Sequence, residues 1–226
     1  MNKLRNLILG VLVLSSSLIF GQTNQINVGF EGGPSLISLY GNDVVESYKD
    51  LSFGFSCGLT FQYNFSKLIS LRTNILFERK GLSTKKQATD EYGNPFGELT
   101  FHSNFNYLTL PLLGKLTFGK KIKFYVNAGP YLGYLLKQKD ITEAFNEYPK
   151  TESDNTDNFE RLDFGVTTGL GMNFSIHENL LLSVEIRNNL GLPNISSLPI
   201  VNDGRIKTNS TNLLIGIAYR IGNKNE

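Results

Sequence analysis

Charged side chains recur at even spacing within several apolar segments, and this spacing gives them a common direction. Arg72, Glu78 and Lys80 lie in one such segment, and Glu185 and Arg187 lie in another. Successive residues of a β-strand point to opposite faces, so residues an even number of positions apart share a face. We expect a polar network inside a closed sheet. Its predicted members are Arg72, Glu78, Lys80, Glu185, Arg187 and Arg220, with Glu31 and Lys115 as further candidates.

Such a network has two interpretations. It could provide a path for ions or protons, or it could fill the interior with paired charges. A buried charge without a partner is costly, and a barrel of about eight strands has an interior only wide enough for side chains. We therefore interpret the network as structural.

The two histidines of the chain offer little catalytic chemistry. His102 is next to Ser103 and close to Glu98, which are the residue types of a base, a nucleophile and an orienting acid. Neighbouring strand residues point to opposite faces, however, and His177 falls in a short turn. A lipid-modifying enzyme is the alternative, and loss of lipid A modification in a His102→Ala variant would support it. We predict no catalytic, cofactor-binding or metal-binding residues and no enzymatic activity.

The segment Asp154–Asn158 resembles half of a calcium loop, with acidic and amide side chains in alternation. It lacks the central glycine and the terminal glutamate that a complete loop of this type requires. The surrounding segment, Lys139–Glu160, is rich in acidic residues. We expect it to be a solvated external loop.

The first residues of the 226-residue chain have the features of an export signal. Lys3 and Arg5 precede an apolar run over residues 6–20, which is too short to span a bilayer as a helix. We expect residues 1–21 to be a cleaved signal peptide and residues 22–226 to form one domain. Without Lys3 and Arg5 the acidic and basic residues are equal in number, so there is no basic field to attract nucleic acid.

Eight segments alternate between apolar and polar residues with a period of two, which is typical of strands with one polar face. In residues 53–63 one face is Phe, Phe, Cys, Leu, Phe and Tyr, and the other is Gly, Ser, Gly, Thr and Gln. Two segments are irregular. Residues 26–40 slip at Gly32-Gly33-Pro34, which predicts a bulge, and residues 100–118 change phase after Phe105. The other strands are expected near residues 69–80, 122–134, 164–174, 182–187 and 213–221.

The connections between these segments alternate between short and long. The short ones lie near residues 64–67, 119–121 and 175–179, and the long ones span 41–50, 81–99, 139–160 and 193–208. Barrels of the bacterial outer membrane have short periplasmic turns and longer external loops. The alternation therefore places both chain ends in the periplasm.

The two faces of the strands differ in a way that indicates a membrane. One carries large Phe, Leu and Ile side chains, and the other combines small residues with long charged ones. Lipid outside and a crowded polar lumen inside would produce this distribution. We predict an all-β fold, an eight-stranded antiparallel up-and-down transmembrane β-barrel of the outer-membrane type. A soluble exported barrel that carries an apolar ligand is an alternative, and release with periplasmic contents on cell fractionation would support it.

Several segments resemble PorT-like outer-membrane β-barrel proteins of the Bacteroidota. Tyr107–Lys115 (YLTLPLLGK) is similar to the family strand Y-L-x-I-P-L-L-x-K, and Ala128–Leu136 is similar to the strand that follows it. Asp163–Gly171, Leu182–Arg187 with Gly191-Leu192, and Val28–Gly33 are similar to further strands of the family. Thr109 and Gly114 replace the more usual acidic or larger residues. The resemblance implies this barrel fold and an accessory role in type IX protein secretion. It supplies no catalytic set.

These observations lead to one functional expectation. We expect a non-enzymatic protein of the outer membrane with a structural or interaction role, with no cofactor. Its expected partners are outer-membrane lipid, lipopolysaccharide and other envelope or secretion proteins, and nucleic acid is excluded.

Overall fold

The computed structural model describes residues 25–43, 52–89, 91–200 and 204–222. The predicted signal peptide, residues 1–21, lies outside these ranges. Within them, no helix has the length and hydrophobicity needed to cross a membrane.

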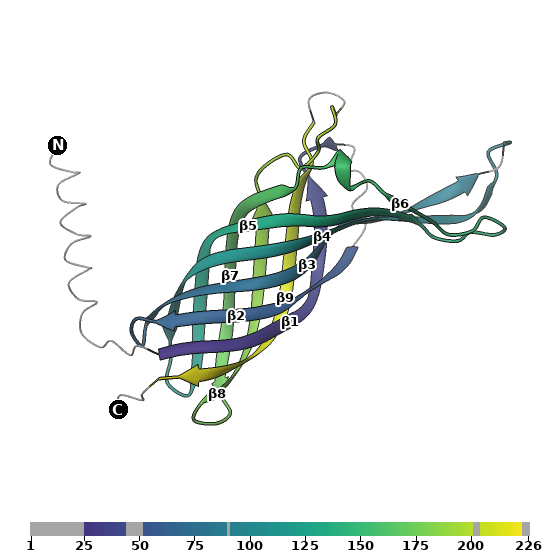
Figure 1. Ribbon diagram of the computed structural model, residues 1–226. Coiled ribbons are helices and arrows are strands. Elements are labelled where there is room, and N and C mark those ends of the chain that lie inside the picture. Colours follow the sequence, from purple (N-terminus) through teal and green to yellow (C-terminus); the bar gives the residue numbers. More distant parts are fainter. Residues whose placement is uncertain (1–24, 44–51, 90, 201–203, 223–226) are drawn as a thin grey trace, which may run out of the picture.

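Antiparallel strands account for most of the described chain, and eight of them close into a ring (Figure 1). The order around the ring is β4, β3, β2, β1, β9, β8, β7 and β5, and pairing of β4 with β5 closes it. The predicted eight-stranded antiparallel barrel is therefore confirmed. The strands are β1 (Gln25–Tyr40), β2 (Ser52–Asn64), β3 (Ile69–Thr89), β4 (Pro95–Phe118), β5 (Ile122–Thr142), β6 (Thr151–Asp154), β7 (Leu162–Ser175), β8 (Leu180–Gly191) and β9 (Lys207–Ile221).

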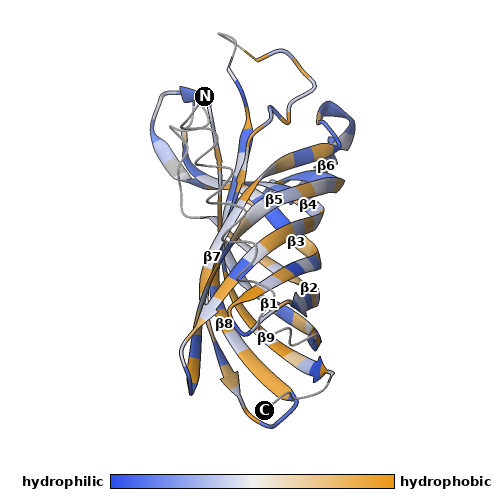
Figure 2. Cartoon of the chain, turned by 90° about the vertical axis from the view of Figure 1, so that its left-hand side faces the viewer, coloured by the Kyte–Doolittle hydropathy of each residue, from blue (hydrophilic) through white to orange (hydrophobic). Residues whose placement is uncertain are grey.

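The apolar face of the ring points outward, and hydrophobic residues recur along the strands of the wall (Figure 2). Phe55, Ile75 and Ile217 are 40%, 51% and 47% exposed, whereas Arg72 and Arg187 on the other face are 3% and 0% exposed. A soluble barrel would show the reverse arrangement, with apolar side chains inside. The soluble ligand carrier is therefore excluded.

Short connections gather at one end of the barrel. They comprise residues 65–68, 119–121 and 176–179, and β1 begins and β9 ends at the same end (Figure 1). Because short turns face the periplasm in this class of protein, we call this the periplasmic end and the opposite one the external end.

A sheet extension projects beyond the wall at the external end (Figure 1). Strands β3 and β4 stay paired from Gly81–Asn104 out to Thr89–Pro95, and β6 adds to the edge of β5 between residues 139 and 142. The long connections expected over residues 81–99 and 139–160 do lie at the external end, but strand pairing covers most of the first segment and parts of the second. Neither a protein core nor a bilayer contacts these residues, so their sequence need not alternate between apolar and polar residues. The backbone hydrogen bonds between the strands nevertheless continue.

Strands β1 and β4 do not change phase, contrary to prediction. The register of β1 against β2 and β9 is constant through Gly32, Gly33 and Pro34, so no bulge is present. In β4 every second residue from Ser103 to Lys115 faces inward. A register shift against β5 does occur between Asn106 and Tyr107, but the extra residue is Leu136 of β5. The apolar residues change face because the lumen itself becomes apolar at the external end. The buried cluster there comprises Leu39, Phe105, Tyr107, Leu135 and Ile195.

Candidate functional site

The middle of the lumen holds a closed ring of four alternating charges, which we call the charge ring: Glu31, Arg72, Glu185 and Arg187. Arg72 donates to Glu31 and, at 2.7 Å, to Glu185. Arg187 completes the ring by donating to Glu31 Oε1 at 2.8 Å and to Glu185 Oε1 at 2.7 Å. Every member is at most 3% exposed. Each charge therefore touches two opposite charges, which is the arrangement that makes buried ions tolerable.

Neutral side chains occupy the remaining acceptor sites of the two carboxylates. Asn74 Nδ2 donates to Glu31 at 2.9 Å, and Asn127 Nδ2 and the Tyr125 hydroxyl donate to Glu185 at 2.9 and 2.8 Å. These bonds come from β3 and β5, so the ring ties the barrel wall together across the lumen. Hydrogen bonds of this charge-assisted kind are among the stronger ones in proteins.

A second cluster lies nearer the external end, around Lys80. Its ammonium donates to Asp163 Oδ2 at 2.9 Å, to the Tyr131 hydroxyl at 3.2 Å and to the Thr208 hydroxyl at 3.3 Å. Glu78 Oε2 lies 3.9 Å from the same nitrogen. The Glu78 carboxylate also accepts four hydrogen bonds, from Thr109, Asn189, Ser210 and Asn212.

The buried charges balance within the described part of the chain. Four carboxylates and four cations are buried: Glu31, Glu78, Asp163 and Glu185, with Arg72, Lys80, Lys115 and Arg187. The polar layers and the apolar cluster above them occupy the lumen between its middle and its external end. Two small cavities of about 30 and 60 Å³ lie on the periplasmic side of the charge ring.

The predicted network and the observed one agree in most members. Arg72, Glu78, Lys80, Glu185 and Arg187 are buried in the lumen, together with the two further candidates Glu31 and Lys115.

Arg220 was predicted to belong to this network, but the structure places it outside the network. Its half-buried side chain lies at the periplasmic mouth, where Nη1 is 3.4 Å from the backbone carbonyl of Glu178. Arg220 is the penultimate residue of β9. The alternation of residues predicted which face of the strand it lies on, but not how far along the barrel axis it lies. Asp163 was missed, because it is only the second residue of β7 after a loop and its partner Lys80 is 83 positions away.

The candidate catalytic residues are not arranged as a catalytic site. Ser103 is buried and its hydroxyl accepts a hydrogen bond from Gln138 Nε2 at 2.9 Å. The adjacent His102 lies in the sheet extension, with Nε2 3.9 Å from Glu143 Oε1. His177 is exposed in the short turn between β7 and β8.

The partial calcium motif engages its own neighbours. Asp154 Oδ1 accepts the Thr156 hydroxyl at 2.5 Å, and Oδ2 lies 2.9 Å from Lys137 Nζ. These contacts, the Thr156 hydroxyl first, lower the pKa of Asp154 from 3.8 to about 2. A second cross-strand pair joins Lys139 to Glu152 at 2.8 Å and lowers the pKa of Glu152. Two exposed ion pairs therefore join β6 to β5, in addition to the backbone pairing of the two strands.

This pairing predicts the acid response of the sheet extension. A depressed pKa means that the Asp154 carboxylate supports the local structure above pH 3.8 and that this support is lost as the pH falls towards 2. The amide shift of Thr156, followed by NMR, should titrate with a midpoint near 2, and Asp154→Asn should abolish the titration. A midpoint near the ordinary value of 3.8 would contradict the assignment.

The closed ring of strands, the outward apolar wall and the charged lumen define a transmembrane β-barrel of the outer-membrane type. The sequence matches the family model "Outer membrane protein beta-barrel domain" over residues 20–197. The chain belongs to this family, and the protein is an outer-membrane β-barrel protein. No curated protein matches the chain.

Solved structures of other barrels align with most of this chain but share little sequence identity with it. Neisserial surface protein A is 14% identical over 86% of this chain and 96% of its own, with a TM-score of 0.48. OprG from Pseudomonas aeruginosa is 11% identical over 90% and 98%, with a TM-score of 0.45. Ail from Yersinia pestis, solved with the heparin analogue sucrose octasulfate, is 14% identical over 87% and 99%, with a TM-score of 0.41.

Proposed function

We propose that the protein is a non-enzymatic anchor of the outer membrane whose sheet extension contacts other envelope proteins. The observation that carries this proposal is the packing of the lumen, in which buried acidic and basic residues are equal in number and apolar side chains cluster at the external end. A barrel filled in this way offers no wide aqueous path. The accessible surface beyond the bilayer is then the extension formed by β3, β4, β5 and β6.

The resemblance to PorT-like barrels supports a finer role for the same surface. In this proposal the signal peptide, residues 1–21, directs export, and the anchored extension assists a protein-secretion assembly of the type IX kind. Outer-membrane lipid surrounds the apolar wall, and lipopolysaccharide is the expected neighbour at the external end.

Site-specific photo-crosslinking in intact cells tests the interaction role. A photoreactive residue in place of Gln87, which is exposed on the extension, should capture an envelope or secretion protein that mass spectrometry can identify. The matched control places the same residue at Ile75, on the lipid-facing wall. Capture of protein at Ile75 alone, or of lipid alone at Gln87, would contradict the proposal.

The filled lumen also predicts the electrical behaviour of the barrel. In a planar bilayer the purified protein should produce no stable current steps above the lipid background, because the charge ring and the apolar cluster block the lumen. A 16-stranded porin serves as the positive control, since its larger circumference leaves an aqueous channel. Reproducible steps at neutral pH would show that the network conducts ions.

A further inference from the structure

Three cations surround a cavity at the periplasmic mouth of the barrel. Lys67 comes from the turn between β2 and β3, Lys123 from the start of β5 and Arg220 from the end of β9. The cavity measures about 60 Å³, and its other lining residues are neutral, with no acidic side chain among those described. The mouth is therefore a positively charged pocket, and none of the buried carboxylates of the lumen lines it.

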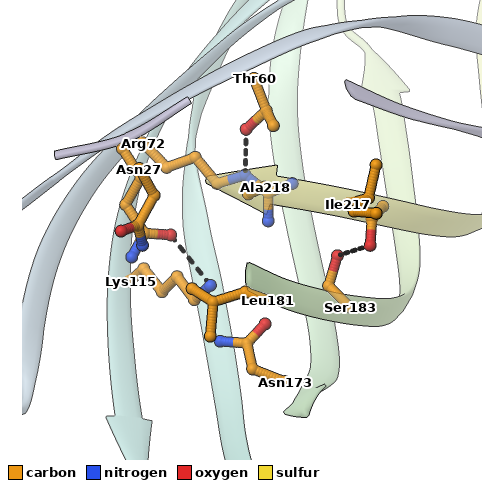
Figure 3. Close-up of a pocket in the computed structure, with 11 residues that line it drawn as sticks. Asn27, Thr60, Arg72, Lys115, Asn173, Leu181, Ser183, Ile217 and Ala218 are labelled. Carbon is orange, nitrogen blue, oxygen red and sulfur yellow. Dashed lines mark hydrogen bonds between the residues drawn. The ribbon is translucent and has the colours of Figure 1, made fainter. Parts of the chain in front are cut away.

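A fourth basic residue, Lys115, lines a cavity further inside the barrel (Figure 3). This second cavity, of about 30 Å³, shares Asn27, Gln62 and Asn173 with the first. Lys115 is 3% exposed; its Nζ donates to Gln62 Oε1 at 3.0 Å and lies 3.6 Å from the centroid of the Tyr125 ring. Among the described residues no carboxylate lies within 4 Å of this ammonium, whereas every other cation buried in the lumen has such a partner.

A side-chain amide that lines both cavities has an atom without a hydrogen-bond partner. The Asn27 amide is 8% exposed, lines both cavities, and has no protein partner for its Oδ1 atom. An amide presents either a donor or an acceptor to a ligand by a flip of its terminal group. Hydroxyl groups of Ser66, Ser70 and Thr117 complete the rim. Buried polar groups without partners call for a ligand or water to satisfy them.

Charge and size together define the ligand. Like charges that converge on a concave, low-dielectric site repel one another and attract an anion. Several cations match the roughly double negative charge of a phosphate group better than a single carboxylate, and lysine and arginine both bind phosphate oxygens. The cavities, of about 30 and 60 Å³, are of the size of a small anion or of the charged end of a larger molecule.

We propose that the periplasmic mouth of the barrel is a binding pocket for a phosphate group. Lys67, Lys123 and Arg220 hold its oxygens at the rim, and Lys115 lines the inner end of the pocket. The pocket lies at the end of the barrel opposite the sheet extension, so it is independent of the interaction role proposed above.

Titration with inorganic phosphate tests the pocket in the full barrel, reconstituted in lipid nanodiscs and observed by NMR. Phosphate should shift the amide signals of residues 66–70 and 122–124 in a saturable way. The Lys67→Gln/Lys123→Gln variant should bind about tenfold or more weakly, because it removes two charge-assisted contacts. Unchanged gel mobility of unheated samples would show that the variant still folds.

Lys120→Gln is the matched control, since Lys120 is exposed in the neighbouring turn and lines neither cavity. An equal loss of binding in this control, or shifts that never saturate, would overturn the proposal. Glycerol 3-phosphate distinguishes the source of the ligand. Equal or tighter binding of this monoester would indicate the phosphorylated end of a larger molecule, and weaker binding would indicate the free ion.

Discussion

Replacement of Arg187 by leucine is expected to lower the free energy of unfolding of the barrel by about 3–5 kcal/mol. The guanidinium is fully buried and bridges Glu31 and Glu185, so its removal leaves both carboxylates with Arg72 as their only ion-pair partner. A buried carboxylate that loses a partner bears its desolvation cost without compensation. Urea unfolding in lipid vesicles, followed by circular dichroism and by gel mobility of unheated samples, measures the loss.

Two further substitutions distinguish the effect of breaking the charge ring from the effect of removing any arginine. Arg161→Leu removes an exposed ion pair with Asp157 and should change stability little, as most surface pairs do. Arg187→Lys keeps the charge but cannot reach both carboxylates with a planar fork, so its effect should lie between the other two. If Arg187→Leu were no more harmful than Arg161→Leu, the charge ring would not hold the barrel together.

The inward direction of the network could be predicted because strand geometry fixes it. Arg72, Glu78 and Lys80 are separated by even intervals, and so are Glu185 and Arg187, and all five are buried as expected. Their partners could not be predicted. Glu31 and Arg187 are 156 positions apart, and the pairing of β1 with β9 and of β9 with β8 brings them together.

The incorrect bulge in β1 has a physical cause that a single sequence cannot reveal. Apolar residues at the start of β1 face lipid, whereas Ile37 and Leu39 face a lumen that is apolar at its external end. A change of face by the apolar residues resembles a slip of the backbone when only the pattern is known. Cross-strand register distinguishes the two, and the register of β1 is the same before and after Gly32–Pro34.

The close contacts of glycines on the lumen side could not be predicted either, because they also depend on the register between strands. Tyr125 of β5 lies directly opposite Gly171 of β7, and its ring occupies the space that a side chain at position 171 would need. The alternation places both residues on the polar face, but it does not show that they are neighbours. This contact leads to the second large prediction.

Gly171→Ala is expected to destabilise the barrel by about 1–3 kcal/mol through overpacking. A Cβ atom at this position would lie 2.6 Å from the Tyr125 hydroxyl and 2.6 Å from the Val184 carbonyl oxygen. The Tyr125 hydroxyl also donates to Glu185, so movement of the ring would disturb the charge ring. Gly114→Ala is the matched control, because its nearest neighbour would be 3.8 Å away, and it should unfold like the parent protein in urea.

A double-mutant cycle identifies which contact resists the added methyl group. If the Tyr125 ring is the main obstacle, Tyr125→Leu combined with Gly171→Ala should destabilise the barrel less than the sum of the two single changes. If the effects add, the obstacle is the Val184 carbonyl, since backbone in a closed barrel cannot move aside for a side chain. Either outcome locates the close packing between β5, β7 and β8, and a neutral Gly171→Ala variant would show that this part of the lumen is loosely packed.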